Sequence, residues 1–299
     1  MTEWKGKTRG GAFGYLFFIF LIKKCGITAA YAFLSTVVIY FIPFAPKATK
    51  SIWFYSRHIL KLNRKSSVKM LVRNYYRLGQ TLIDKVAIGN GMQDKYNFCF
   101  ENYNEFLDIL NSNQGTIIIG AHIGNWEIGT PFFDEYGKKI NIVLYDAEYQ
   151  KIKEILKNNT AYSDYKMIPV SNKSLDHVFA IKEAIDSKEY VCFQGDRYVN
   201  EDRLLKSSFM GKEAYFPIGP FLLASKMKAP VVFYFSMREK GRTYRFHFTI
   251  ATPIIQEKGK RGEQALLEQY IVALENTLQK YPEQWFNYYN FWDINKKSE

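Results

Sequence analysis

The chain has 299 residues, of which 47% are hydrophobic and 17% aromatic, and its formal net charge is +12 with a pI near 9.3. The length suits one large α/β domain, the hydrophobic content argues against disorder, and three scattered cysteines without a C-x-x-C pair argue against a disulfide or zinc framework. The positive charge favours an anionic partner, whether lipid headgroups, an acidic carrier protein or nucleic acid.

Residues 1–45 are predicted to form a helical membrane anchor. An apolar run over residues 12–22 is followed by Lys23 and Lys24, and residues 26–44 then contain no charge. The second run approaches the length of a membrane span, and no signal-peptide cleavage site follows the first. We expect a membrane-embedded hairpin with both ends cytoplasmic, or one span and one interfacial helix. A pair of buried core helices is the alternative.

Residues 47–89 are predicted to form basic amphipathic helices. Aromatic and apolar side chains recur at helical spacing, and cations lie between them: Lys50, Arg57, Lys61, Arg64, Lys65, Lys69, Arg73 and Arg77. Such helices suit the surface of an anionic bilayer. The chain has no helix-turn-helix, zinc-finger or aromatic RNA-stacking signature, so we expect no nucleic-acid partner.

From residue 96 onward, strand and helix patterns alternate, which predicts a mixed central sheet flanked by helices within one domain over residues 46–299. Strands are expected at residues 96–100, 116–120, 139–145, 189–193, 230–237 and 242–252. Helices are expected at residues 103–110, 148–157, 174–186, 220–228 and 263–280.

The most informative stretch follows the strand expected at residues 116–120. His122 comes directly after this strand and Glu127 five positions later, with Gly120 and Gly124 allowing a sharp turn. Open α/β sheets place their chemistry at this edge. A histidine exchanges protons near neutral pH, and a carboxylate at its other ring nitrogen fixes the tautomer. A hydrogen-bonded core histidine with a surface glutamate is the alternative.

Further polar residues follow later elements. Asp196 and Arg197 come after the strand expected at residues 189–193. Asp196 is expected to contact the acceptor or His122, and Arg197 an anionic headgroup or an oxyanion; a surface ion pair is the alternative. Gly219 opens another expected helix, whose N-terminus suits a phosphate.

Other catalytic signatures are absent from the sequence, which has neither a G-x-S-x-G nucleophile elbow nor a P-loop. His58, His177 and His247 show no metal-ligand spacing with one another or with cysteine, so we expect surface or packed side chains. We therefore expect chemistry that uses neither a metal nor a cofactor.

Four ordered blocks resemble the late acyltransferases of lipid A biosynthesis and their relatives. The first, His122-Ile-Gly-Asn-Trp-Glu127, is similar to the His-x4-Asp/Glu signature of lipid acyltransferases. The others lie at residues 193–197, 209–232 and 281–285, and the resemblance covers residues 10–292. It implies a glycerol-phosphate-acyltransferase-like α/β fold.

The resemblance also implies a function. The chain would be an enzyme of the bacterial inner membrane that acts on the cytoplasmic side and moves a fatty acyl chain from acyl carrier protein or a coenzyme A thioester to a lipid hydroxyl. His122 would be the general base with Glu127, and Asp196 a third catalytic residue. The substrate-binding residues would be Asn125, Trp126, Arg197 and Gly219. A non-catalytic lipid- or carrier-binding membrane protein of the same fold is the alternative.

Two departures from the family pattern leave the acceptor open. Many lipid A enzymes carry Tyr-Arg-Pro after the third strand, where residues 144–148 read Leu-Tyr-Asp-Ala-Glu. The arginine of a C-terminal Trp-x4-Arg motif is also missing from residues 285–292. Both losses remove positive charge that would meet a phosphorylated sugar. A lipid A precursor, a lysolipid, an amino-acid lipid and a polyene-type pigment lipid are all candidate acceptors.

Overall fold

The computed structural model of the chain describes residues 11–129, 133, 136–145, 165–170, 174–198, 203–253 and 261–292. The chain divides into two compact units. The first contains the residues up to Lys95, Ser208–Tyr215 and the C-terminal segment from Tyr281, and the second contains Tyr96–Ser207 and Phe216–Lys280. The helix expected at residues 148–157 lies outside the described residues.

The second unit is built on a seven-stranded sheet in the order β1-β9-β8-β2-β5-β3-β4. Its strands are β1 (Asn97–Glu101), β2 (Thr116–Gly120), β3 (Ile140–Tyr145), β4 (Lys166–Val170), β5 (Tyr190–Gln194), β8 (Val231–Arg238) and β9 (Thr243–Ile250). Neighbouring strands are parallel except β8 with β9, so β1 and β9 run against the other five. Every residue of β2 is buried, as in a parallel strand that is covered on both faces.

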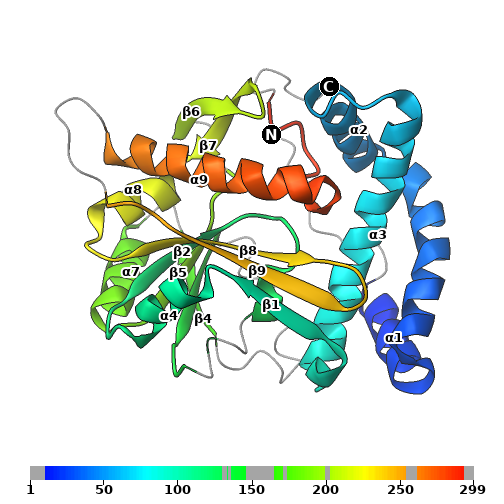
Figure 1. Cartoon of the computed structure of the whole chain (residues 1–299), viewed down its shortest axis with the longest axis horizontal. Helices are drawn as coiled ribbons and strands as arrows, with labels where there is room; N and C mark the ends of the chain where they lie inside the picture. Colours follow the sequence, from blue (N-terminus) through cyan, green and yellow to red (C-terminus); the bar gives the residue numbers. More distant parts are fainter. Residues whose placement is uncertain are drawn as a thin grey trace. The chain divides into compact units, whose positions relative to one another are not determined.

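Helices cover both faces of this sheet. They are α4 (Tyr103–Asn111), α7 (Asp176–Asp186), α8 (Ile218–Lys226) and α9 (Gly262–Lys280). Successive residues of β8 point to opposite faces: Phe233 contacts Tyr270 of α9, whereas Tyr234 contacts Phe248, which stacks on Phe106 of α4. Figure 1 shows α8 beside α9 on one side of the sheet and α7 on the α4 side. The predicted mixed sheet flanked by helices is confirmed.

Three strands form where the sequence pattern predicts none. Pro169 in β4 lacks a backbone N–H and argues against a strand, but β4 is an edge strand, where proline is tolerated. β6 (Leu204–Phe209) and β7 (Lys212–Pro217) form a separate two-stranded sheet. Met210 and Gly211 join them with φ angles of 53° and 75°. Methionine rarely adopts a positive φ angle, so the sequence of these two residues does not predict a turn.

The first unit begins with helices α1 (Gly11–Phe44), α2 (Pro46–Phe54) and α3 (Arg64–Gly89), with a π-helical turn between α2 and α3 at Tyr55–Ile59. Helices therefore cover residues 47–89 apart from a break at residues 60–63. Asn63 caps α3, since its side chain accepts the backbone N–H of Ser66 at 2.9 Å.

Gly26 divides α1 into two arms. Its φ of 84° and ψ of 167° are not helical. The ring centroids of Phe17 and Phe33 lie 5.1 Å apart, whereas a continuous helix would separate these residues by about 24 Å. The chain therefore reverses at Gly26, and residues 23–25 at the turn are exposed. By length and composition alone, Phe17–Phe44 is a candidate membrane span, and it includes this reversal.

The C-terminal segment is fixed to α3. The buried amide of Asn74 donates to the backbone carbonyls of Glu283 at 3.1 Å and Trp285 at 2.9 Å. Trp285 packs edge-to-face against Tyr55 and Phe209. The block at residues 281–285 that resembles a family motif therefore makes structural contacts within the first unit.

Candidate active site

Two paired parallel strands bring a histidine and an aspartate together. β2 and β5 are in register with Gly120 opposite Gln194. His122 and Asp196 follow these positions, so both emerge at the carboxyl edge of the sheet. The Nδ1 of His122 lies 2.7 Å from Oδ1 of Asp196, and the backbone N–H of His122 donates to Oδ2 at 2.9 Å. These contacts fix the ring and leave Nε2 as the nitrogen that can accept a proton.

The two side chains differ in their exposure to solvent. The Asp196 side chain is fully buried, whereas 24% of the His122 side chain is exposed. A buried carboxylate at Nδ1 selects one tautomer and stabilises the imidazolium, while the exposed part of the ring can meet a substrate. From the sequence, Asp196 is expected to contact either the acceptor or His122, and the structure contains the contact with His122. Glu127 is expected from the sequence to be the carboxylate that orients the His122 ring. In the structure, the carboxylate at Nδ1 of His122 belongs to Asp196.

A glycine makes the turn that follows His122. Gly124 has a φ of 56°, and a Cβ on it would lie 1.9 Å from the carbonyl oxygen of Ser236 on β8. The next residue, Asn125, is buried and donates its backbone N–H to the same oxygen at 2.8 Å. The carbonyl of Trp126 accepts the hydroxyl of Tyr234 at 3.3 Å. The turn is therefore fixed to β8, the neighbour of β2.

The remaining expected site residues lie on three segments. Glu127 is half-buried on η3 (Trp126–Gly129), a 3-10 turn. Arg197 is half-buried directly after Asp196. Gly219 lies in the first turn of α8, and no hydrogen bond joins it to His122 within the described part of the chain.

Tyr270 of α9 supports the site from the other side of β2, and the sequence pattern does not reveal it. Its hydroxyl donates to the carbonyl of Gly120 at 2.9 Å, and the backbone N–H of Gly195 donates to the same oxygen at 2.9 Å. A Cβ on Gly195 would lie 2.9 Å from the Tyr270 ring. The helical spacing of α9 marks Tyr270 only as one of several core residues.

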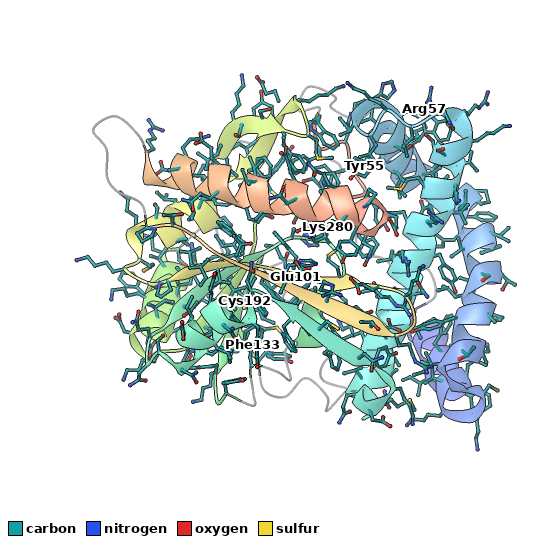
Figure 2. The ribbon with its side chains drawn as sticks, viewed as in Figure 1. Tyr55, Arg57, Glu101, Phe133, Cys192 and Lys280 are labelled. Carbon is teal, nitrogen blue, oxygen red and sulfur yellow. The ribbon has the colours of Figure 1, made fainter. Side chains whose placement is uncertain are left out.

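A small cavity lies next to the end of β2. Its volume is about 10 Å³, room for roughly one water molecule. Its lining includes Gly120, Trp126, Phe133, Cys192, Gln194 and Tyr234. Figure 2 labels Phe133 and Cys192 on the side of the sheet away from Lys280 of α9. Burial raises the pKa of the Cys192 thiol to about 12, so this cysteine is a poor nucleophile at neutral pH.

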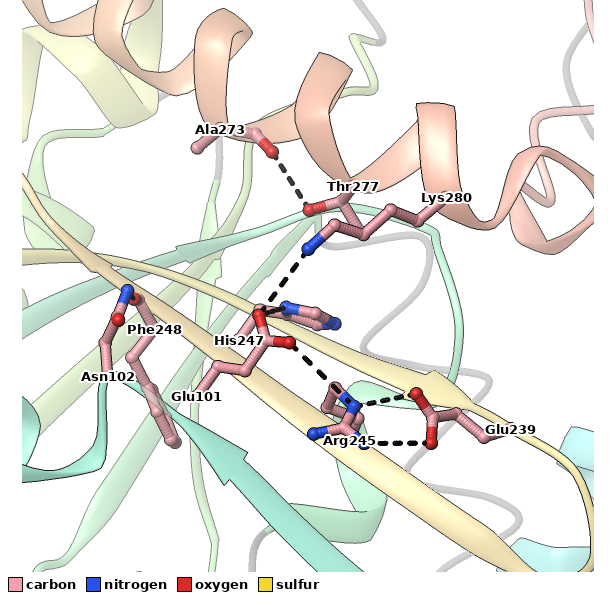
Figure 3. A network of polar contacts seen from close by, with 9 residues as sticks. All are labelled: Glu101, Asn102, Glu239, Arg245, His247, Phe248, Ala273, Thr277 and Lys280. Carbon is pink, nitrogen blue, oxygen red and sulfur yellow. Dashed lines mark hydrogen bonds and ion pairs between the residues drawn. The ribbon is translucent and has the colours of Figure 1, made fainter.

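A second histidine–carboxylate pair has a different setting. His247 of β9 lies opposite Glu101 of β1, with its Nδ1 2.8 Å from a Glu101 oxygen. Glu101 also pairs with Lys280 at 3.7 Å and Arg245 at 3.9 Å (Figure 3). His247 is 9% exposed, and burial lowers its pKa although Glu101 opposes the shift. It is a packed histidine, one of the two settings expected for it, and it helps to link the β1–β9 edge to α9.

The described residues contain no group of three or more His, Cys, Asp or Glu side chains placed to hold a metal ion. His58 packs on the ring of Phe54 at 4.9 Å, and His177 lies in the first turn of α7. Neither His58 nor His177 shares a helix or strand with His122 or His247.

Comparison with known families gives a match over nearly the whole chain. A model described as bacterial lipid A biosynthesis acyltransferase matches residues 6–293. This range includes His122 and Asp196. No curated protein matches the chain significantly.

Proposed function

Because the chain belongs to the bacterial lipid A biosynthesis acyltransferase family, we propose that it moves a fatty acyl chain from a thioester donor, acyl carrier protein or coenzyme A, to a hydroxyl of a lipid. One observation carries the assignment of the site: the 2.7 Å contact between His122 and Asp196 at the carboxyl edge of two parallel strands. The proposed location is the cytoplasmic side of the bacterial inner membrane. The charge of +12 and the apolar helix α1 support this location.

In the proposed mechanism, His122 is the general base. Asp196 accepts the Nδ1–H, so Nε2 takes the proton of the acceptor hydroxyl while its oxygen attacks the thioester carbonyl carbon. The carbon–sulfur bond then breaks, and the leaving thiolate takes the proton back from Nε2. Proton transfer of this kind contributes roughly 10²–10⁴-fold to the rate. The buried carboxylate of Asp196 stabilises the imidazolium between the two steps.

The neighbouring residues receive supporting roles. We assign Glu127 the second acidic position near the imidazolium, and Arg197 the binding of an anionic headgroup or the oxyanion. Asn125 and Trp126 shape the substrate-binding turn, and Gly219 lies in the first turn of α8, whose N-terminus suits an anionic group. No step of this mechanism uses a metal ion or a cofactor, so an excess of EDTA should leave the rate unchanged.

The decisive experiment incubates the purified full chain with radiolabelled acyl carrier protein or acyl-coenzyme A and a total lipid extract. The expected result is one lipid class that gains an acyl ester, identified by mass spectrometry. Lipid A precursors and lipids without phosphate are supplied separately, because two family arginines are missing from this chain. Tight binding of lipid or carrier without any product would favour the non-catalytic alternative.

A further inference from the structure

The second arm of α1 packs along α3. Three contacts join the two helices in antiparallel order: Tyr31 with Asp84, Leu34 with Gly79, and Phe41 with Tyr75. The hydroxyl of Tyr31 donates to the carboxylate of Asp84, which is fully buried. A Cβ on Gly79 would lie 2.3 Å from Leu34, so the two helices approach closely there. The apolar arm is therefore a packed part of the first unit.

The helix α3 is too charged to enter the hydrocarbon of a bilayer. Its charged residues are Arg64, Lys65, Lys69, Arg73, Arg77, Asp84 and Lys85. Each such side chain costs roughly 2.5–3.5 kcal/mol at the centre of a membrane helix. A spanning α1 would either draw α3 into the bilayer or break the contact between Tyr31 and Asp84. A membrane-spanning hairpin is thus incompatible with the packing of α1 on α3.

The turn between the two arms of α1 gives a second, independent indication. Lys23 and Lys24 are exposed beside Gly26, where the chain reverses. A spanning hairpin would move both ammonium groups across the hydrocarbon. A hairpin that lies in the plane of the membrane keeps both among the lipid headgroups.

The outward side of the second arm carries large exposed apolar side chains and lies within a strongly basic segment. Phe33, Ile39, Tyr40 and Phe44 are between 42% and 70% exposed. Residues 11–83 contain eleven lysines and arginines and no acidic residue, which nearly accounts for the net charge of +12. Apolar side chains accompanied by cations are what an anionic bilayer surface binds.

We propose that α1, α2 and α3 dock flat on an anionic bilayer, with the outward side of α1 at the acyl boundary. The turn at residues 23–26 then stays on the side of the membrane that holds His122. This topology differs from the membrane-embedded hairpin expected from sequence, and it rests on the membrane association in the proposed function. It makes the enzyme a surface-bound protein in which none of the described residues lies on the far side of the membrane.

The exposed Cys25 at the turn reports this topology directly. Inverted and right-side-out membrane vesicles containing the full chain are treated with a membrane-impermeant maleimide, and the labelled peptides are mapped. A Ser187→Cys variant supplies a reference at an exposed position after α7, and Cys25→Ser removes the reporter. We expect Cys25 and Ser187→Cys to react from the same face. Reaction of Cys25 only from the opposite face, or from neither face, would overturn the proposal.

A second experiment tests the docking side of α1. Ile39→Asp is compared with Phe179→Asp on α7, because the two native side chains are similarly exposed at 70% and 71%. In flotation with vesicles of phosphatidylglycerol and phosphatidylethanolamine, Ile39→Asp should bind about tenfold more weakly, and Phe179→Asp should bind like the parent chain. Equal binding by both variants, or a full chain that is soluble without detergent, would overturn the proposal. Docking without acyl transfer would instead refute the proposed function alone.

Discussion

Asp196 holds His122 at two points, the ring nitrogen Nδ1 and the backbone N–H. In the proposed reaction, a substrate group at Nε2 would meet an imidazole whose orientation and tautomer are already set, which would lower the reorganisation that the reaction needs. His247 has a comparable carboxylate contact with Glu101, but its ring is buried in the sheet. The proposed catalytic role of His122 can therefore be compared with the structural role of His247.

Replacing His122 with alanine should lower the acyl-transfer rate by roughly 10²–10⁴-fold, the contribution of general-base catalysis. Folding should be preserved, because the side chain is partly exposed. His247→Gln is the matched control and should keep the rate within a few-fold of the parent while lowering the thermal midpoint. Both variants are measured by initial rate and by thermal denaturation. A His122→Ala enzyme with normal turnover would eliminate the proposed base.

Replacing Asp196 and replacing Glu127 should have different effects. Asp196→Asn presents an amide to Nδ1 and favours the wrong tautomer, so kcat should fall more than in Glu127→Gln. Initial rates and thermal denaturation, measured side by side, separate a loss of ring orientation from a loss of stability. If Asp196→Asn lowers the melting temperature but keeps its kcat, Asp196 has only a structural role.

Among the elements, the turn between β2 and η3 depends on β8. Gly124 approaches the carbonyl of Ser236 so closely that a methyl group would overlap it. The adjoining backbone N–H of Asn125 bonds that same carbonyl. The position of Glu127 therefore depends on a strand that comes about a hundred residues later in the chain.

Gly124→Ala should destabilise the second unit and lower activity together. Left-handed backbone costs a non-glycine residue roughly 1–3 kcal/mol, and the clash with Ser236 adds to this. Gly137→Ala is the control that measures the cost of left-handed backbone alone. Gly137 has a φ of 62°, and a methyl group added there would have no atom within 4 Å. Chemical denaturation gives the two free energies of unfolding. Equal losses in the two variants would mean that the contact with β8 is unimportant.

The sequence predicts elements better than it predicts their partners. The bounds of β2 follow from its apolar run, and His122 with Glu127 can be recognised because both lie within six consecutive residues. The contact of His122 with Asp196 joins positions 74 residues apart and depends on the pairing of β2 with β5, which strand periodicity does not specify. Tyr270 is beyond prediction for the same reason, because helical spacing does not show which strand a residue will meet.

Acid should destabilise the whole molecule through its buried histidine. Burial lowers the pKa of His247, with Lys280 and Arg245 contributing in the same direction. As the pH falls, the unfolded chain therefore binds a proton at residue 247 before the folded protein does. The contribution of neutral His247 to stability is fully present above its ordinary pKa of 6.5, and it is lost as the pH falls through the lowered pKa. The thermal midpoint should decline below about pH 6.5, and His247→Gln should decline less. An unchanged pH dependence in the variant would contradict this origin.

At the scale of the whole molecule, the charge is concentrated where membrane docking is proposed. Binding to anionic vesicles should have a cationic component that salt screens and an apolar component that it does not. Raising the salt from about 0.1 M to about 1 M shortens the screening length from roughly 10 Å to 3 Å, so flotation should show weaker binding without full release. Replacing the exposed Lys65, Lys69 and Arg73 with glutamine should reduce this salt dependence, and neutral vesicles should show little of it. Complete release of the protein by salt would mean that the apolar side of α1 does not enter the bilayer. Binding that does not respond to salt would mean that the eleven cations of residues 11–83 do not face the bilayer.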